Sequence, residues 1–340
     1  MRHKKLRRKS LLCAATVLCT VAAAAAMLCI IHKWGNKEST EEPYSYEDEG
    51  RAEFYYKDGW YAQDPDKETL LLVGVDKYSE ELAASLQLGK ETDKNINTQQ
   101  ADFLLLLILD KQKNVCQVLP LNRDTMTPIT ALGTSGEVIG TFEGQLALAH
   151  TDGDGGMASG YNTVQAVSDL LYGIEIDHFI TVTMDAVPLL NDMVGGVTVK
   201  VEDDFSAVTD QLPQGQEVRL TGPLALTFVR ARHDVADETN ISRMTRQKTY
   251  LEAFYRQLKE KQAAQERFTL DALLELSSYM VSDCSVTALN ELCPEILDSR
   301  LEVLEAPEGE AVKGERYMEF YPDRQKLQDT VIDLLFERVE

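Results

Sequence analysis

One stretch, FLLLLILD at residues 103–110, restricts the fold more than any other part of this 340-residue chain. Its first seven side chains are all apolar. Successive side chains of a β-strand point to opposite faces of the sheet, so a strand of this composition is buried on both faces. The stretch therefore predicts a central strand with helices packed on each side of it.

The segments around this strand predict the rest of a sheet. TLLLVGVD (69–76) is short, apolar and ends in a glycine-containing turn, as expected of a second buried strand. VCQVLPL (115–121) follows the turn DKQKN and is predicted to form a hairpin with 103–109. Further strands are predicted at 176–184, at 197–201 and at the end of LTGPLALTFVRAR (220–232), and helices at 158–173, 185–196, 241–261, 270–281, 285–298 and 323–337.

Strands that alternate with helices are typical of the α/β class. We therefore predict a three-layer α-β-α fold with a central mixed sheet. No internal repeat is visible, and the globular pattern continues to the end of the chain. The prediction is a single exported domain at 67–340, behind an N-terminal transmembrane helix.

The export prediction depends on the N-terminal segment LLCAATVLCTVAAAAAMLCII (11–31), whose 21 residues carry no charge. That length is sufficient to cross a bilayer as a helix. Six basic residues in 1–10 place the N-terminus in the cytoplasm and the rest of the chain outside. We interpret 11–31 as a retained signal anchor and the acid-rich segment 32–66 as a juxtamembrane linker. A cleaved signal peptide is the alternative, but the apolar run continues through Met27–Ile31, beyond the alanines that would be cleaved.

The composition narrows the function further. The 56 acidic and 34 basic residues give a formal net charge of −22, which argues against nucleic acid as a partner. The cysteines outside the apolar segment, Cys116, Cys284 and Cys293, lack zinc-binding spacing. The sequence allows two states of Cys284 and Cys293, a disulfide between them or two unlinked thiols. The chain has no Walker loop, kinase motif or G-x-S-x-G sequence.

Four arginines gather in FVRARHDVADETNISRMTRQ (228–247) despite the acidic composition. A strand ending at Arg232 would place Arg230 on the same face. On the helix that follows, Arg243 and Gln247 are four residues apart and face one pocket, whereas Arg246 is predicted to point toward solvent. The ordinary alternative is that these arginines pair with the acidic loop between them, Asp234, Asp237 and Glu238.

Two other polar positions argue against that alternative. In the predicted hairpin, Asp102 precedes one strand and Arg123 follows the other, so both lie at one end of the sheet. If strand 69–75 is antiparallel to 103–109, Asp76 lies there too. Carboxylates with arginines suit Mg²⁺ and a phosphate or pyrophosphate group, because the metal takes oxygen ligands and guanidinium groups bind phosphate oxygens in pairs.

The order of these motifs resembles the LytR-CpsA-Psr family. The resemblance covers about 67–340 and rests on TLLLVGVD, AD before the apolar strand, NRDT, QLALAH leading into GYNTVQAVSDLLYG, LTGPLALTFVRAR and SRMTRQ. Members of the family are anchored in the cell membrane of Gram-positive bacteria with the large domain outside. They attach polyprenyl-pyrophosphate-linked glycopolymers, such as wall teichoic acid or capsule, to peptidoglycan. The resemblance thus implies a Mg²⁺-dependent phosphotransferase of the polyisoprenyl-teichoic acid–peptidoglycan transferase type.

The resemblance also implies roles for individual residues. Asp76 and Asp102 would coordinate Mg²⁺, and together with Arg123 they would form the catalytic set. Asp124 would orient Arg123 and the backbone around it. The residues expected to bind the pyrophosphate are Arg123, Arg230, Arg232, Arg243 and Gln247.

Two positions depart from the family pattern. The family has arginine where Gln100 stands and proline where Asn122 stands. The first departure removes a positive charge near the site, which implies a lower activity or another substrate class. The alternative function is a non-catalytic homologue that holds the lipid pyrophosphate or acts as a scaffold. A third, transcriptional regulation, conflicts with the anchor and the acidic surface. An apolar cavity for the polyprenyl chain is expected between the sheet and the helices at 158–172 and 241–258, because burying each CH₂ contributes about 0.8 kcal/mol.

Overall fold

The structure is a computed structural model, and it describes residues 53–76, 97–133, 135–237, 239–315 and 317–339. The basic tail at 1–10 and the predicted membrane anchor at 11–31 lie outside these residues. Within the described ranges, no helix combines the length and hydropathy needed to cross a bilayer.

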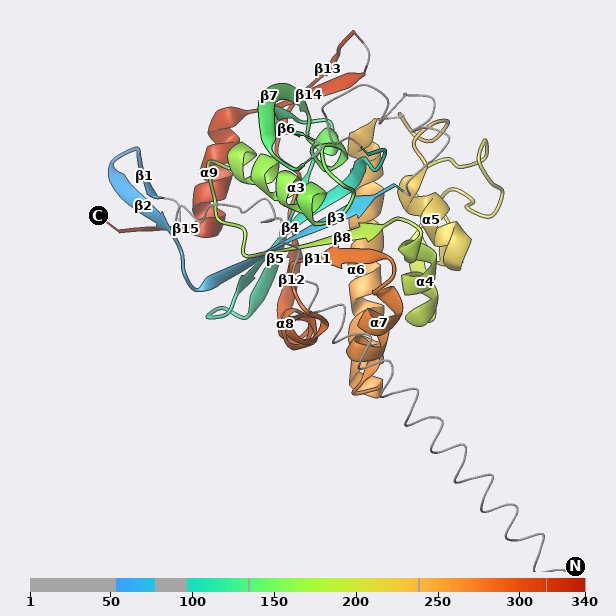
Figure 1. Cartoon of the computed structure of the whole chain (residues 1–340). Helices are drawn as coiled ribbons and strands as arrows, with labels where there is room; N and C mark the ends of the chain where they lie inside the picture. Colours follow the sequence, from blue (N-terminus) through green and yellow to red (C-terminus); the bar gives the residue numbers. More distant parts are fainter. Residues whose placement is uncertain (1–52, 77–96, 134, 238, 316, 340) are drawn as a thin grey trace, which may run out of the picture. The chain divides into compact units, whose positions relative to one another are not determined.

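A six-stranded mixed sheet forms the centre of the fold (Figure 1). The apolar stretch FLLLLILD (103–110) lies in one of its central strands. It pairs antiparallel with 115–121, as predicted, and also antiparallel with 69–75, which meets the condition set for Asp76. In spatial order the strands are β11 (Met280–Ser282), β8 (His178–Thr183), β3 (Lys67–Val75), β4 (Ala101–Asp110), β5 (Val115–Leu121) and β12 (Arg300–Val303). Two of the five strand pairs, β3 with β8 and β5 with β12, are parallel.

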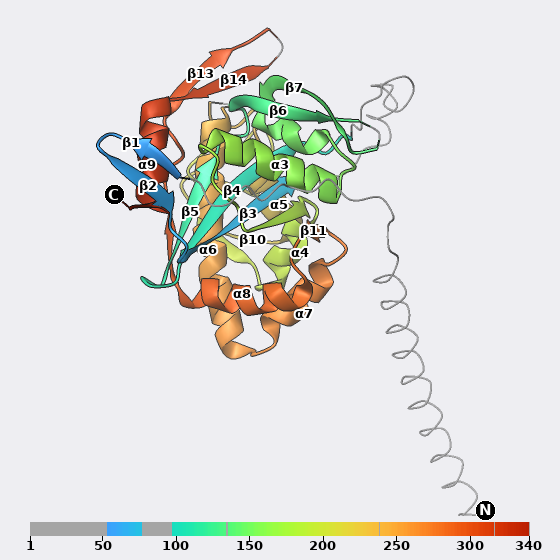
Figure 2. The same cartoon turned by 60° about the vertical axis from the view of Figure 1, so that its left-hand side comes forward.

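Both faces of this sheet are covered by helices (Figures 1 and 2). Leu71 and Val73 of β3 point to the face that packs on α3 (Met157–Leu170) and α9 (Arg324–Leu335). Leu70, one residue away, points to the opposite face. The opposite face is covered by α6 (Asn240–Ala264), α7 (Phe268–Leu276) and α8 (Val286–Asp298). The predicted α/β class with a mixed sheet between helical layers is therefore confirmed.

A second apolar core lies beside α6 and contains Phe205 and Phe228, whose rings stack 5.9 Å apart. Met184, which directly follows β8, belongs to this core and connects it to the central sheet. Its elements are α4 (Ala186–Met193), β9 (Val197–Lys200), β10 (Glu217–Leu220) and α5 (Gly222–Arg230).

The segment 222–230 corrects one prediction, because it is a helix and not the strand expected to end at Arg232. Pro223 occupies the first turn, where its missing N–H costs no hydrogen bond. The aromatic and β-branched residues of the segment indicated a strand. Burial of Phe228 and Val229 in the second core outweighs that local preference.

Short hairpins and a 3₁₀ helix complete the fold, and the sequence did not predict them. β1 (Glu53–Tyr56) and β2 (Gly59–Gln63) pair with the C-terminal strand β15 (Phe336–Arg338). This corrects the linker assigned to 32–66, since its part from Glu53 onward contains folded strands. The other elements are β6 (Met126–Leu132), β7 (Val138–Gln145), η1 (Leu146–Thr151), β13 (Gly309–Lys313) and β14 (Met318–Pro322).

Candidate functional site

Two carboxylates meet at one end of the central sheet. β3 and β4 pair up to Val75 and Ala101, and the N–H of Asp76 donates to the carbonyl oxygen of Gln100 over 3.1 Å. This places the side chains of Asp76 and Asp102 next to each other. Burial raises the pKa of Asp76, and the negative charge of Asp102 raises it further, while Arg230 acts in the opposite direction. Such a pair of oxygen donors suits a divalent cation, whose charge relieves the repulsion.

Asp102 is the centre of an ion-pair network. Its side chain is only 7% exposed, and Oδ1 accepts hydrogen bonds from Nη1 of Arg123 and, over 3.2 Å, from Nη1 of Arg243. Asn240 Oδ1 fixes the Arg243 guanidinium, accepting from Nε at 3.1 Å and from Nη2 at 2.6 Å. Burial lowers the pKa of Arg243, and the Asp102 charge opposes that change. A buried cation requires such a partner.

Arg123 follows β5 in a tight turn in which Asn122 Oδ1 accepts the N–H of Asp124 at 3.0 Å. Its Nη2 donates to Gln100 Oε1 at 2.6 Å. Gln100 is the position where the family pattern has arginine, and here it supplies an acceptor in place of a positive charge. The Nε of Arg123 is buried without a hydrogen-bond partner among the described residues, 3.8 Å from Asp124 Oδ1. Because Nε is shut off from solvent, the Asp124 carboxylate is the anionic group that faces it.

Asp124 belongs to the same turn as Arg123 and connects it to other parts of the fold. Its Oδ1 accepts from Gln145 Nε2 at 3.0 Å, its backbone oxygen accepts from the N–H of Phe320 at 2.9 Å, and Arg232 Nη2 lies 3.9 Å from Oδ2. Burial raises the pKa of Asp124, and the charges of Arg123 and Arg232 oppose that change. Gln145 was not among the site residues expected from the sequence. The QLALAH motif, which it begins, was the available signal.

Arg230 lies at the entrance of the site. It is the last residue of α5, its side chain is 50% exposed, and Nη2 pairs with Asp76 Oδ1. The ion pairs of Arg230 and Arg243 thus go to carboxylates more than a hundred residues away. Pairing with the adjacent acidic loop, the ordinary alternative, does not describe these two arginines.

Arg246 contradicts the prediction that it points toward solvent. Its side chain is 6% exposed, and it donates to the carbonyl oxygens of Phe228 (3.2 Å) and Ala231 and to Asp203 Oδ2 (2.6 Å). The helix α6 is buried on two sides, and Arg246 faces the second core. Its contacts lie outside the network around Asp102 and bind the end of α5.

Gln247 is buried, as predicted, and donates through Nε2 to the carbonyl oxygen of Val229 at 3.3 Å. It lines the small hollow that contains Asp102 and Arg123, and also an adjoining apolar cavity of about 140 Å³. The residue therefore stands at the boundary between the charged network and an apolar space.

The apolar space continues between the sheet and the helices. A further cavity of about 240 Å³ shares Leu72, Leu251 and Phe254 with the first one and is lined by β3, β4, β5 and helices α6, α7 and α8. The predicted wall at 241–258 corresponds to α6. The other predicted wall, 158–172, is wrong, because α3 covers the opposite face of the sheet.

Comparisons with known proteins agree on one family. The model of the LytR_cpsA_psr family matches residues 30–333. The polyisoprenyl-teichoic acid–peptidoglycan teichoic acid transferase TagU of Halalkalibacterium halodurans is 27% identical over 185 residues, which are 54% of this chain and 56% of the relative. The chain thus spans about half the length of this relative.

Solved structures share the fold. The crystal structure of B. subtilis TagV superposes with a TM-score of 0.58 at 21% identity and covers 79% of this chain and 97% of TagV. TagT bound to LI-WTA superposes with a TM-score of 0.56 at 20% identity and covers 79% of this chain and 90% of TagT. At these identities the likeness concerns the fold.

Proposed function

This chain belongs to the LytR-CpsA-Psr family, and we propose on that premise that it is a Mg²⁺-dependent phosphotransferase. Its substrate would be a polyprenyl-pyrophosphate-linked anionic glycopolymer of the wall teichoic acid or capsule type, and its acceptor peptidoglycan. The names of TagU and of the TagT complex support this class of reaction. The observation that carries the proposal is the network around Asp102, which places two carboxylates and three arginines beside an apolar cavity.

Asp76 and Asp102 would hold the metal. Their proximity and the raised pKa of Asp76 fit a site that a divalent cation completes. Mg²⁺, when bound, supplies positive charge that stabilises the pyrophosphate oxygens. The ion pair that Asp76 makes with Arg230 would open when metal binds, which frees the guanidinium for the substrate.

The arginines would bind the pyrophosphate and stabilise the charge that develops during transfer. Arg230 is half-exposed and is suited to receive the entering anion. Arg123 would contribute the charge of its guanidinium group beside Asp102, and Arg243 supplies a buried charge that Asn240 keeps in one orientation. Arg232 would act at the Asp124 side of the site, and Gln247 at the start of the apolar cavity.

The apolar cavity would bind the polyprenyl chain. It is lined almost entirely by side chains such as Leu72, Leu251 and Phe254, and the neighbouring hollow at Asp102 shares Phe103, Gln247 and Leu251 with it. A lipid diphosphate needs this combination, with cationic groups for its head and apolar side chains for its tail. A soluble nucleotide or sugar phosphate would leave the apolar part empty.

The decisive experiment is a transfer assay with the full chain in detergent micelles, a lipid-linked glycopolymer precursor and peptidoglycan. We expect Asp102→Asn and Arg243→Ala to lower the rate by roughly 100-fold or more, because each removes a charge from the network. Arg267→Ala is the control, since that side chain is 75% exposed and its ion pair is with Asp271, four residues later. Equal rates in all four proteins would refute the proposed site.

The alternative of a non-catalytic binding protein is favoured by Gln100, whose amide replaces a positive charge beside Arg123. A thermal unfolding assay separates it from the proposal. In both cases Mg²⁺ with a polyprenyl diphosphate should raise the melting temperature of the wild type and not of Asp102→Asn. If the ligand stabilises the wild type but the wild type transfers no glycopolymer, the protein is a binding protein and not an enzyme.

A further inference from the structure

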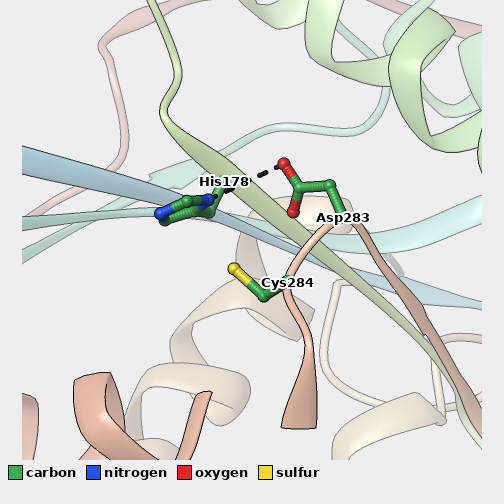
Figure 3. Close-up of side chains that lie close together, drawn as sticks. All are labelled: His178, Asp283 and Cys284. Atoms are coloured by element: carbon green, nitrogen blue, oxygen red, sulfur yellow. Dashed lines mark ion pairs between the residues drawn. The ribbon is translucent and has the colours of Figure 1, made fainter. Parts of the chain in front are cut away.

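A second cluster of ligand-type side chains lies away from the Asp102 network. Figure 3 shows His178, Asp283 and Cys284 facing one another. One nitrogen, one carboxylate oxygen and one sulfur of the three lie within 4.8 Å of one another. His178 is the first residue of β8, and the other two lie between β11 and α8, about a hundred residues later in the chain.

Hydrogen bonds preorganise this cluster. Ser282 Oγ donates to the carbonyl oxygen of Phe179 at 2.6 Å, and the N–H of Phe179 donates to Asp283 Oδ1 at 3.0 Å. The N–H of Cys284 donates to Ser282 Oγ at 3.0 Å. The turn before α8 is thus tied to the start of β8. Oδ2 of Asp283 remains on the side of the histidine ring.

A carboxylate lies near each nitrogen of the imidazole ring. Nδ1 of His178 lies 3.7 Å from Asp283 Oδ2, and Nε2 lies 3.8 Å from Glu68 Oε1. The other oxygen of Glu68 pairs with Lys111 at 2.7 Å. Histidines that bind metal through one nitrogen commonly present the other to a carboxylate, which sets the tautomer and raises the basicity of the ligand.

We propose that His178 Nδ1, Asp283 Oδ2 and Cys284 Sγ form a Zn²⁺ site, with water as the fourth ligand. Nitrogen and sulfur donors favour zinc over Mg²⁺, which prefers oxygen. Tetrahedral zinc with bonds of this kind separates its ligand atoms by about 3.3–3.6 Å. The distance from His178 to Asp283 is already close to that range, and rotation of the Cys284 side chain completes the set.

Other roles for the thiol fit less well. The disulfide considered from the sequence is not formed, since Cys284 and Cys293 are both free. A metal is the partner that uses all three side chains at once.

The site is separate from the proposed active site, and its expected role is structural. His178 is paired with Leu70, six residues before Asp76 along β3, which corresponds to roughly 20 Å. The metal would join β8 to the start of α8. Cys293, Ile296 and Leu297 of α8 line the apolar cavity, so zinc would stabilise one wall of that cavity.

The test uses the full chain in detergent, stripped of metal with a chelator and kept in excess Mg²⁺. Zn²⁺ affinity is measured by competition with a chromogenic chelator, and Co²⁺ is used as a spectroscopic probe. We expect one Zn²⁺ per chain and a sulfur-to-cobalt charge-transfer band. The band should be absent in Cys284→Ser and present in Cys293→Ser, which is the matched control. Glu68→Gln should bind about tenfold more weakly.

Thermal unfolding excludes misfolding as the cause. Metal-free Cys284→Ser should melt at the temperature of the metal-free wild type, and Zn²⁺ should raise only the melting temperature of the wild type and of Cys293→Ser. If the wild type binds no stoichiometric Zn²⁺, or if Cys284→Ser keeps the affinity and the band, the site does not exist. Neither result bears on the transferase proposal, which rests on other residues.

Discussion

Arg243 and Arg246 stand three residues apart on α6, and both are buried, but they stabilise different parts of the molecule. Arg243 points to Asp102 and the sheet, whereas Arg246 points to the end of α5. The guanidinium group of Arg246 also lies 5.5 Å from the ring of Phe205. At the scale of the residue, the groups that surround each guanidinium decide whether it can contact a ligand. Arg243 lies in the network around Asp102, and Arg246 lies outside it.

This difference predicts opposite consequences for two arginine variants. Arg246→Ala should lower the free energy of unfolding by about 3 kcal/mol, because it leaves Asp203 and two carbonyl oxygens without their donor. Arg230→Ala should change it by about 0–1 kcal/mol, because that ion pair is half-exposed. Urea unfolding of both variants gives the comparison. A stable Arg246→Ala protein would mean that the contacts of this side chain contribute little.

His150 predicts a pH dependence. It is fully buried, its Nδ1 contacts the carbonyl oxygen of Gln99 at 3.0 Å and therefore carries the proton, and burial lowers its pKa to about 4. The unfolded chain has the ordinary value of about 6.5 and so binds a proton first as the pH falls. Stability from the neutral ring is complete above pH 6.5 and is lost between about 6.5 and 4.

We expect the wild type to lose roughly 2 kcal/mol between pH 7 and 4.5 through this group. His150→Gln should lack that component of the slope, although it should be less stable at neutral pH. Urea unfolding at a series of pH values measures the difference between the two proteins, in which the acidic residues that titrate in both cancel. Parallel curves would show that folding does not lower the pKa of His150.

At the scale of the element, α3 packs directly on the sheet through a glycine. A Cβ built on Gly160 would collide with the ring of Phe179 on β8, and that ring is buried between the helix and the sheet. The edge-to-face contact of Tyr161 with Phe179, with ring centroids 5.2 Å apart, occurs at the same crossing. The residue at this position therefore sets the distance between helix and sheet.

Gly160→Ala should accordingly destabilise the protein by about 1–3 kcal/mol, since the added methyl group displaces a ring in a filled core. Gly140→Ala on β7 is the control, because a Cβ there meets no atom within 4 Å. Its effect should stay within about 0.5 kcal/mol. Thermal or urea unfolding tests the pair, and an unchanged Gly160→Ala protein would indicate that α3 can shift freely.

At the scale of the whole molecule, the two faces of the central sheet differ. The face toward α3 and α9 is filled by one continuous core, whereas the face toward α6, α7 and α8 contains the apolar cavities. The charged network lies where those cavities reach the sheet end. One side of the sheet is therefore suited to a ligand with a charged head and an apolar tail.

The proposed function also requires this domain to be outside the cell. The basic residues of 1–10 followed by the uncharged span 11–31 predict that 32–340 is extracytoplasmic. Protease added to intact protoplasts should digest the domain and spare a cytoplasmic control protein. A domain that is digested only after lysis would be inconsistent with both the topology and the reaction with peptidoglycan.

Local pattern was sufficient for the central features. The unbroken apolar run of β4 and the short turn after it determined a hairpin, and the positions of Asp102 and Arg123 relative to that hairpin determined that they share a sheet end. Helical spacing likewise placed Arg243 and Gln247 on the buried side of α6. Each of these inferences needs only the geometry of one or two adjacent elements.

Only the tertiary structure decided the rest, because spacing along a chain does not specify which neighbour covers a face. The composition of 222–230 favoured a strand, but its packing in the second core makes it a helix, and the same core buries Arg246. The cavity is on the α6 face and not at α3 for the same reason. His178 and Cys284 are separated by about a hundred residues, and the pairing of β8 with β11 brings them together. Such contacts depend on long-range packing, which no local periodicity encodes.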